Sequence, residues 1–131
     1  IGIDTFGYFM VGNYGEDIAT VKATKDLMLT LPLDYVQIAP IFYPPDTELY
    51  AEVMKVIKYD YWRTYTINPD HKIDFPIVGT DFTRKQINAI VRNMYLRFYL
   101  RPKFLLNFIS KLKSFDEMLR SLKALVDMFK E

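Results

Sequence analysis

The residues best placed to bind a ligand form a glycine turn between an apolar run and an acidic helix start. A strand-like run at residues 3–11 is followed by Gly12-Asn13-Tyr14-Gly15 and then by Glu16 and Asp17. Glycines accept the positive φ that tight turns need, and parallel α/β proteins bind ligands beyond the carboxyl ends of their strands. The turn at residues 12–16 is therefore the predicted ligand position, with a plain strand–helix connection as the alternative.

Several common kinds of site are excluded. The chain has no G-x-G-x-x-G fingerprint and no Gly-Lys-Ser/Thr run, and acidic residues at a helix start disfavour a phosphate there. It has no cysteine and a single histidine, His71. Disulfides, thiolate-held zinc and cysteine-held iron–sulfur clusters are thus excluded within the chain, and multi-histidine metal sites are poorly supported.

The elements that must position this turn form a strand–helix–strand unit. Strands at residues 3–11 and 35–39 flank a helix at 16–29, an order that implies parallel strands and a right-handed crossover. The almost continuous apolarity from Phe6 predicts a first strand that is buried on both faces. Glu16 and Asp17 are expected in the first helical turn, where the helix dipole favours negative charge.

Prolines and caps divide the rest of the chain. Pro44-Pro45 force an extended loop, after which Asp46 or Thr47 caps a helix at residues 48–58. The aromatic stretch at 59–82 is predicted to be loop with one short strand near residues 77–78.

From Thr83 onward the chain is predicted to be helical. Thr83 and Gln86 match a capping box, and Pro102 starts or kinks a shorter helix through residue 112. A second box, Ser114 with Glu117, precedes another apolar stripe. That stripe consists of Phe115, Met118, Leu119, Leu122, Val126 and Phe129.

Three motifs in order resemble the carboxy-terminal part of radical S-adenosylmethionine enzymes. They are "GIDTFGYFMVGNYGED", "LDYVQIAPIFYPPDTELY" and the run Arg97-Phe98-Tyr99-Leu100-Arg101-Pro102. The closest branch carries a cobalamin-binding domain and includes proteins similar to the anaerobic magnesium-protoporphyrin IX monomethyl ester cyclase. The resemblance implies an α/β fold with the last strand–helix units of a TIM-like partial barrel at residues 1–58. An aromatic-rich connecting segment at 59–82 and a helical region at 83–131 follow.

The resemblance also implies which residues bind S-adenosylmethionine. The glycine-rich turn after the fifth barrel strand helps to position the cofactor, the end of the sixth strand lies near its adenine, and the next loop lines the active-site mouth. On this chain the corresponding residues are Gly12, Asn13, Gly15, Glu16, Ile38, Pro40 and Tyr43. The alternatives are a core aliphatic residue for Ile38 and a strand terminator for Pro40. The usual Pro-Gly-Thr of the family is Pro45-Asp46-Thr47 here.

One departure from the family decides the expected role of the chain. The three cysteines that hold the 4Fe-4S cluster are absent, so no catalytic residue is assigned and no cofactor is expected on this chain alone. The implied parent is an oxidoreductase or methyltransferase that uses S-adenosylmethionine, the cluster and, in this branch, cobalamin. The chain is then a non-catalytic fragment that supplies part of the cofactor wall.

Charge supports a competing hypothesis of a self-contained binding module. Residues 1–82 carry 6 Lys/Arg and 12 Asp/Glu, whereas residues 83–131 carry 11 and 4. The basic helices could contact an anionic partner, or they could simply have solvated faces. The aromatic residues of the basic segment 92–103 share a core-facing stripe, so no nucleic-acid partner is expected.

The expected partners follow from the fragment hypothesis. The missing amino-terminal half of the same protein would pair with the first strand. Without it, either two copies pair edge to edge as a homodimer or the carboxy-terminal helices fold over the open face. No membrane span is expected because no apolar run reaches 18 residues, and a cytoplasmic location is expected.

Overall fold

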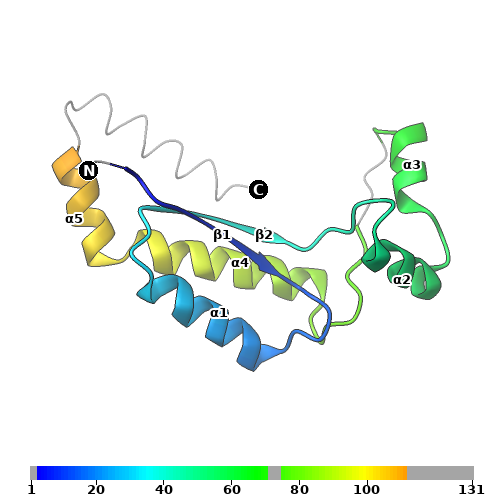
Figure 1. The fold of residues 1–131 in the computed structure, drawn as a ribbon, viewed down its shortest axis with the longest axis horizontal. Helices are drawn as coiled ribbons and strands as arrows, with labels where there is room; N and C mark the ends of the chain where they lie inside the picture. The colour runs from blue at the N-terminus through cyan, green and yellow to red at the C-terminus, as the bar shows by residue number, and fades with distance from the viewer. Residues whose placement is uncertain (1–2, 71–74, 112–131) are drawn as a thin grey trace.

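The computed structural model describes residues 3–70 and 75–111, with side chains to residue 106, as a mixed α/β arrangement. Figure 1 shows two strands beside two long helices, with a pair of short helices at one end. In chain order the elements are β1 (Phe6–Val11), α1 (Ile18–Thr30), β2 (Tyr35–Pro40), α2 (Glu48–Ile57), α3 (Tyr61–Ile67), α4 (Arg84–Tyr99) and α5 (Pro102–Lys111).

The predicted strand–helix–strand unit is confirmed. β1 and β2 pair in parallel, from Phe6 beside Tyr35 to Val11 beside Pro40. The connecting helix α1 begins two residues later than predicted, because Asp17 is its N-cap and forms a capping box with Thr20. Glu16 therefore lies outside the helix and Asp17 is its cap, so the prediction that both sit in the first helical turn is wrong.

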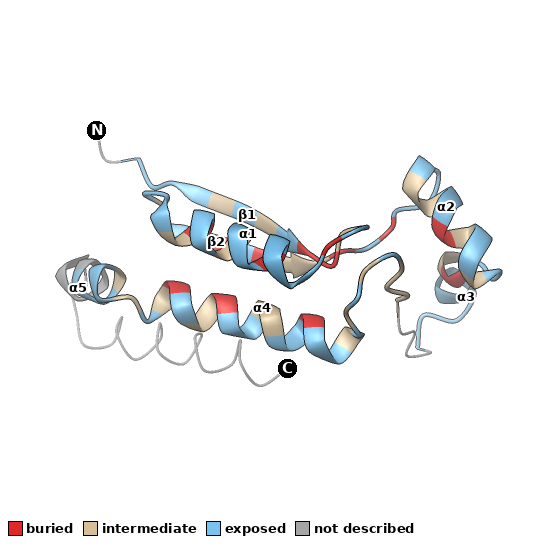
Figure 2. Ribbon diagram, turned by 90° about the horizontal axis from the view of Figure 1, so that it is seen from below, coloured by how far each residue is buried: buried red, intermediate tan, exposed pale blue. Residues whose placement is uncertain are grey.

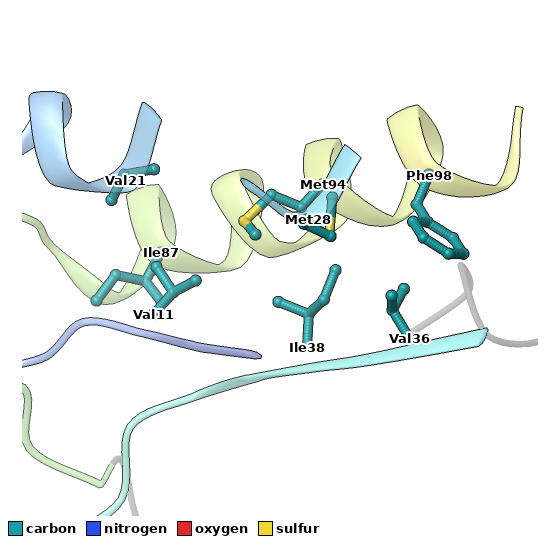
Figure 3. Packing of buried hydrophobic residues seen from close by; sticks show 8 residues of the cluster. All are labelled: Val11, Val21, Met28, Val36, Ile38, Ile87, Met94 and Phe98. Carbon is teal, nitrogen blue, oxygen red and sulfur yellow. The ribbon is translucent and has the colours of Figure 1, made fainter. Parts of the chain in front are cut away.

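The hydrophobic core lies between the sheet and two helices on one side of it. Figure 1 shows α1 and α4 on the same side of the strands, and Figure 3 shows their side chains meeting those of the sheet. The buried members are Val11, Val21, Met28, Val36, Ile38, Ile87, Met94 and Phe98. α4 thus packs on the sheet in the same layer as α1. Its side chains Ile87, Met94 and Phe98 are each fully buried and hold it there.

The opposite face of the sheet is open to solvent. Phe6, Tyr8 and Met10 of β1 are 51%, 75% and 43% exposed, and Figure 2 shows the alternation along the strand. The prediction that β1 is buried on both faces is therefore wrong for the described part of the chain. Continuous apolarity here reflects one core face and one exposed aromatic face rather than two core faces. We call this second surface the open face; on β2 it includes Tyr35 and Gln37.

The outer edge of β2 is closed by two tyrosine hydroxyls from α4. The Tyr95 hydroxyl accepts the Ile38 N–H (2.8 Å) and donates to the Ile38 carbonyl (3.1 Å). One helical turn later, Tyr99 makes the same pair of bonds with Val36, at 3.3 and 3.0 Å. The two rings stack with 6.2 Å between centroids. Each hydroxyl thus replaces the neighbouring strand that a backbone N–H and C=O normally require.

The rest of the Arg97–Pro102 run anchors the same junction. Phe98 is fully buried, the Arg101 guanidinium lies 3.8 Å from the Phe98 ring centroid, and an Arg101 N–H donates to the Leu33 carbonyl. Together with Tyr99, the side chains of Phe98 and Arg101 therefore hold α4 against β2 and against the turn before β2.

The segment after α2 differs from its prediction. Asp60 caps α3 by accepting the Arg63 N–H, so a short helix forms where only loop was predicted. No strand forms at residues 77–78, because the Tyr43 hydroxyl bonds both the N–H and the carbonyl of Val78 at 3.2 Å. A side chain thus satisfies the backbone groups that a strand would have paired.

Helices α2 and α3 form a second cluster beyond the end of the sheet (Figure 2). Its buried residues are Ile41, Tyr43, Val53 and Tyr61, with Trp62 and Phe75 packed against them. Burial raises the pKa of Tyr61 to about 12, and its hydroxyl donates to the Tyr43 carbonyl at 2.8 Å. The cluster accounts for Tyr61, Trp62 and Phe75, half of the aromatic residues at 59–82, as packing.

The predictions for the carboxy-terminal end and for a partial barrel stay predictions. The capping box at Ser114 and Glu117, its apolar stripe and the helix end at residue 112 lie outside the described residues. The partial-barrel prediction stays a prediction, since two parallel strands are common to open sheets and barrels. Across residues 3–70 and 75–111, no helix is both long and apolar enough to cross a membrane.

The tyrosine contacts at the β2 edge predict a specific loss of stability. Tyr95→Phe or Tyr99→Phe should each lower the free energy of unfolding by about 1–2 kcal/mol, because two backbone groups lose their partner. Urea unfolding followed by circular dichroism measures this. Tyr8→Phe is the control, since Tyr8 is exposed and should change stability by less than about 0.5 kcal/mol. Equal losses for all three variants would contradict a role for the hydroxyls.

Candidate functional site

The turn after β1 is held closed by a buried carboxylate. Gly12 has φ +96°, and its N–H donates to a carboxylate oxygen of Glu16. Glu16 is only 8% exposed, and its backbone N–H donates a hydrogen bond to the Asn13 carbonyl at 3.0 Å. A Cβ on Gly12 would lie 2.7 Å from the Ile87 side chain, so a larger residue would need Ile87 to shift and would also be strained by the positive φ. Of the predicted site residues, Gly12 and Glu16 thus shape the turn by bonding each other.

A distant segment pins the same turn from outside. The Gly15 N–H donates to the Gly79 carbonyl at 2.5 Å, and the Thr80 hydroxyl donates to the Glu16 carbonyl at 2.7 Å. Gly79 has φ +77°, and the Tyr14 ring lies so close that a Cβ there would fall 2.0 Å from it. Sequence reasoning missed Gly79 and Thr80; a lone glycine in the predicted loop was the available signal.

Asn13 offers the most adaptable polar group of the predicted set. Its side chain is half-buried, and its amide donates to the Met10 carbonyl at 3.5 Å, the outer limit of a hydrogen bond. A weak internal bond of this kind can be exchanged for a ligand at little cost. Asn13 also lies directly beyond the carboxyl end of β1, next to the open face.

Ile38 and Pro40 occupy structural positions at the end of β2. The Ile38 side chain is 4% exposed and points into the core (Figure 3), and Tyr95 holds both of its backbone groups. The structure therefore gives Ile38 the role of a core aliphatic residue. Pro40 pairs with Val11 as the last residue of β2, the strand terminator that was its alternative.

Tyr43 is buried away from any ligand-facing surface. It is 1% exposed, and its carbonyl accepts the Tyr61 hydroxyl at 2.8 Å and the Trp62 indole N–H at 2.5 Å. In the described structure Tyr43 joins the sheet to α3, and its predicted place at an active-site mouth stays a prediction. Its neighbour Phe42, which is 51% exposed, presents its ring to solvent instead.

The described residues around the turn suit binding rather than proton transfer or metal binding. The open face supplies aromatic and thioether groups, and Asn13 and Gln37 supply amides. Within residues 3–70 and 75–111, no three His, Asp or Glu side chains gather as a metal ion would require. The exposed groups of this surface are aromatic rings, a thioether and amides, which contact ligands without covalent bonds.

Shifted ionisation occurs elsewhere and has a structural cause. The pKa of Asp60 is lowered, first by the Arg63 N–H and then by the Tyr50 hydroxyl, which donates to it at 2.7 Å. Burial and this carboxylate raise the pKa of Tyr50. Perturbed groups can mark active sites, but here the cap of α3 accounts for the pair.

The loop before α2 keeps a conformation that normally belongs to glycine. Asp46 has φ +62°, in the left-handed region that glycine adopts freely. Thr47 is the N-cap, accepting the Tyr50 N–H at 3.1 Å. Of the two predicted caps, Thr47 is correct and Asp46 is not. The Pro45-Asp46-Thr47 turn thus keeps a backbone suited to Pro-Gly-Thr although its central residue differs.

Comparison with known proteins points to one functional class. The chain is 34% identical over 108 residues to an uncharacterized methyltransferase of Pyrococcus horikoshii. The match covers 80% of this chain and 22% of that protein, so the chain spans about a fifth of its relative. No family model matches the sequence, and no solved structure matches it. The similarity fits a methyltransferase-like role at a coarse level.

The contribution of the Gly79–Tyr14 contact to stability can be measured apart from the contribution of backbone strain. Gly15→Ala should cost about 1 kcal/mol from its positive φ alone, since nothing lies within 4 Å of its Cβ. Gly79→Ala should lower the free energy of unfolding by about 1–3 kcal/mol more than Gly15→Ala, because the added methyl group would clash with the Tyr14 ring. Thermal unfolding compares the two variants. In a Tyr14→Ala background the excess should disappear; if it persists, the ring does not pin the turn.

Asp46 should tolerate glycine and reject branched residues. Asp46→Gly should leave stability unchanged or raise it by up to about 1 kcal/mol, because glycine has no penalty in the left-handed region. Asp46→Val should lower it by at least about 1 kcal/mol. Asp46→Asn is the matched control and should be neutral. Unfolding in urea measures all three, and a neutral valine variant would show that the turn relaxes freely.

Proposed function

We propose that this chain forms part of the S-adenosylmethionine-binding wall of a methyltransferase of the radical type. The observation that carries the proposal is the glycine turn after β1, fixed by Glu16 and Gly79, at the carboxyl end of a parallel strand pair. Ligands of such sheets bind at that end. Similarity to a methyltransferase over 108 residues supports a methyl donor as the ligand.

The hydrogen bonds of the turn indicate which residues would contact the cofactor and which would only position the turn. The Asn13 amide has the weakest internal bond at the turn and is the proposed polar contact. Met10, whose carbonyl accepts the Asn13 amide, is 43% exposed, and Phe42, which follows the end of β2, is 51% exposed. Both offer apolar surface to an adenine ring. Gly12, Gly15 and Glu16 position the turn, since their polar groups already bond within the protein.

An iron–sulfur cluster does not fit this chain. The sequence contains no cysteine, and thiolates are the usual ligands of a 4Fe-4S cluster. In the proposed function the cluster, and any cobalamin, belong to the remainder of a larger protein. The similar methyltransferase is long enough to contain such a remainder, since the match covers 22% of it. That remainder is the proposed partner, and the outer edge of β1, which no strand within residues 3–70 and 75–111 pairs with, is its proposed docking strand.

The alternative of a module for an anionic partner has less support in the described part. Two basic side chains of the carboxy-terminal region bond backbone carbonyls: Arg84 bonds Phe75 and Arg101 bonds Leu33. Their charges help to hold the fold together. Lys85, Arg92 and Lys103 are exposed, which moderate solvated helix faces also explain.

Cofactor binding should be weak and confined to the turn. Titrating ¹⁵N-labelled chain with S-adenosylmethionine to millimolar concentration should shift the amides of Asn13 and Gly15 with a Kd above about 0.1 mM, since each lost 1.4 kcal/mol of contact costs tenfold. Asn13→Ala should abolish the shifts. Asn93→Ala on α4 is the matched control and should keep them.

Three results would count against the proposal. An absence of shifts at the turn would remove the binding site, and shifts confined to α3 would move it elsewhere. Low-micromolar affinity would show that the chain holds a complete site rather than part of a wall.

A further inference from the structure

The side chain of Tyr14 places a fixed aromatic ring on the glycine turn. A Cβ on Gly79 would overlap three adjacent atoms of this ring, so the ring lies directly against the Gly79 backbone. The Gly79 carbonyl also accepts the Gly15 N–H at 2.5 Å, which ties the residue after Tyr14 to the same point. Tyr14 is nevertheless 69% exposed in the described structure. The ring is therefore held in place by one contact while most of its surface stays accessible.

A ring that is fixed before binding suits contact with a ligand. Less side-chain freedom is lost when an ordered group meets its ligand than when a mobile one does. The rings of Tyr61 and Phe98, by comparison, are fully buried and are explained by packing. Packing explains only the part of the Tyr14 ring that touches Gly79.

The charges near this ring are negative. Glu16 and Asp17 follow it in the chain, and neither residues 5–21 nor residues 75–83 contain a lysine or an arginine. Both carboxylates already accept backbone N–H groups, so they contribute to the local potential without being free ligand groups. The face of an aromatic ring also carries partial negative charge and attracts cations. The surroundings of the ring therefore favour a positively charged group over an anionic one.

We propose that the Tyr14 ring contacts the positively charged sulfonium group of S-adenosylmethionine, and so distinguishes this methyl donor from S-adenosylhomocysteine. The two molecules differ only by the transferred methyl group and its positive charge. This contact rests on the proposed function, in which the donor lies at the turn after β1. There Asn13 offers a polar contact, while Met10 and Phe42 offer apolar surface to the adenine. A cation over the face of an exposed tyrosine changes affinity by about two- to fivefold.

Comparing the two ligands on ring variants of the full 131-residue chain tests the contact. Amide shifts of ¹⁵N-labelled chain give each dissociation constant. S-adenosylmethionine should bind about two- to fivefold more tightly than S-adenosylhomocysteine to the unmodified chain and to Tyr14→Phe, which keeps the ring. Tyr14→Leu keeps an apolar side chain without a ring, and its two dissociation constants should be equal. S-adenosylhomocysteine is the internal control, because a loosened turn would weaken the binding of both ligands alike.

The possible results separate this contact from the proposed function. Suppose that both ligands shift the Asn13 and Gly15 amides, but that they bind the unmodified chain equally or keep their affinity ratio in Tyr14→Leu. The donor then binds at the turn without a sulfonium contact, and only the role of Tyr14 is refuted. If neither ligand shifts these amides at millimolar concentration, the proposed function fails, and the sulfonium contact fails with it.

Discussion

The hydrogen bonds between two α4 tyrosines and the backbone of β2 determine the form of the described structure. A strand in a two-stranded sheet must satisfy its outer N–H and C=O groups with water, another strand or side chains. Here Tyr95 and Tyr99, one helical turn apart, match the spacing of Ile38 and Val36 along β2. Meeting that spacing fixes the angle and the depth at which α4 lies on the sheet. Phe98, between them on the helix, then enters the core beside Val36 (Figure 3).

Closing one edge gives the two strands different roles. β2 is enclosed by α4 on its edge and by the core on one face, whereas β1 has an exposed aromatic face and, among the described residues, no strand on its outer edge. The turn that we propose as a ligand site follows β1. A segment that paired with the outer edge of β1 would therefore lie next to Gly12 and Asn13 of that turn.

Local signals in the sequence predicted the elements well, and contacts between distant residues limited the rest. The strands at 6–11 and 35–40, their parallel order and the cap at Thr83 follow from apolar runs, glycines and a capping box. Helix α3 was missed because its cap, Asp60, sits in a stretch whose aromatic content suggested loop. The burial of Tyr43 could not be predicted, because its position after a strand does not show that its hydroxyl bonds Val78, 35 residues later. The exposure of Phe6 and Tyr8 was likewise hidden, since apolar side chains look alike on a covered and an uncovered face.

The candidate site also depends on a distant contact, which explains why its residues could be named but not assigned roles. Glu16 resembles a binding carboxylate in the sequence, yet its charge is directed inward to the Gly12 N–H. The Gly79–Thr80 segment then fixes Gly15 and Glu16 from outside. Because that segment leads directly into α4, the helix that seals β2 also positions the turn after β1. A shift of α4 would therefore disturb both the sheet edge and the turn after β1, so the geometry of the candidate site depends on the packing of this helix.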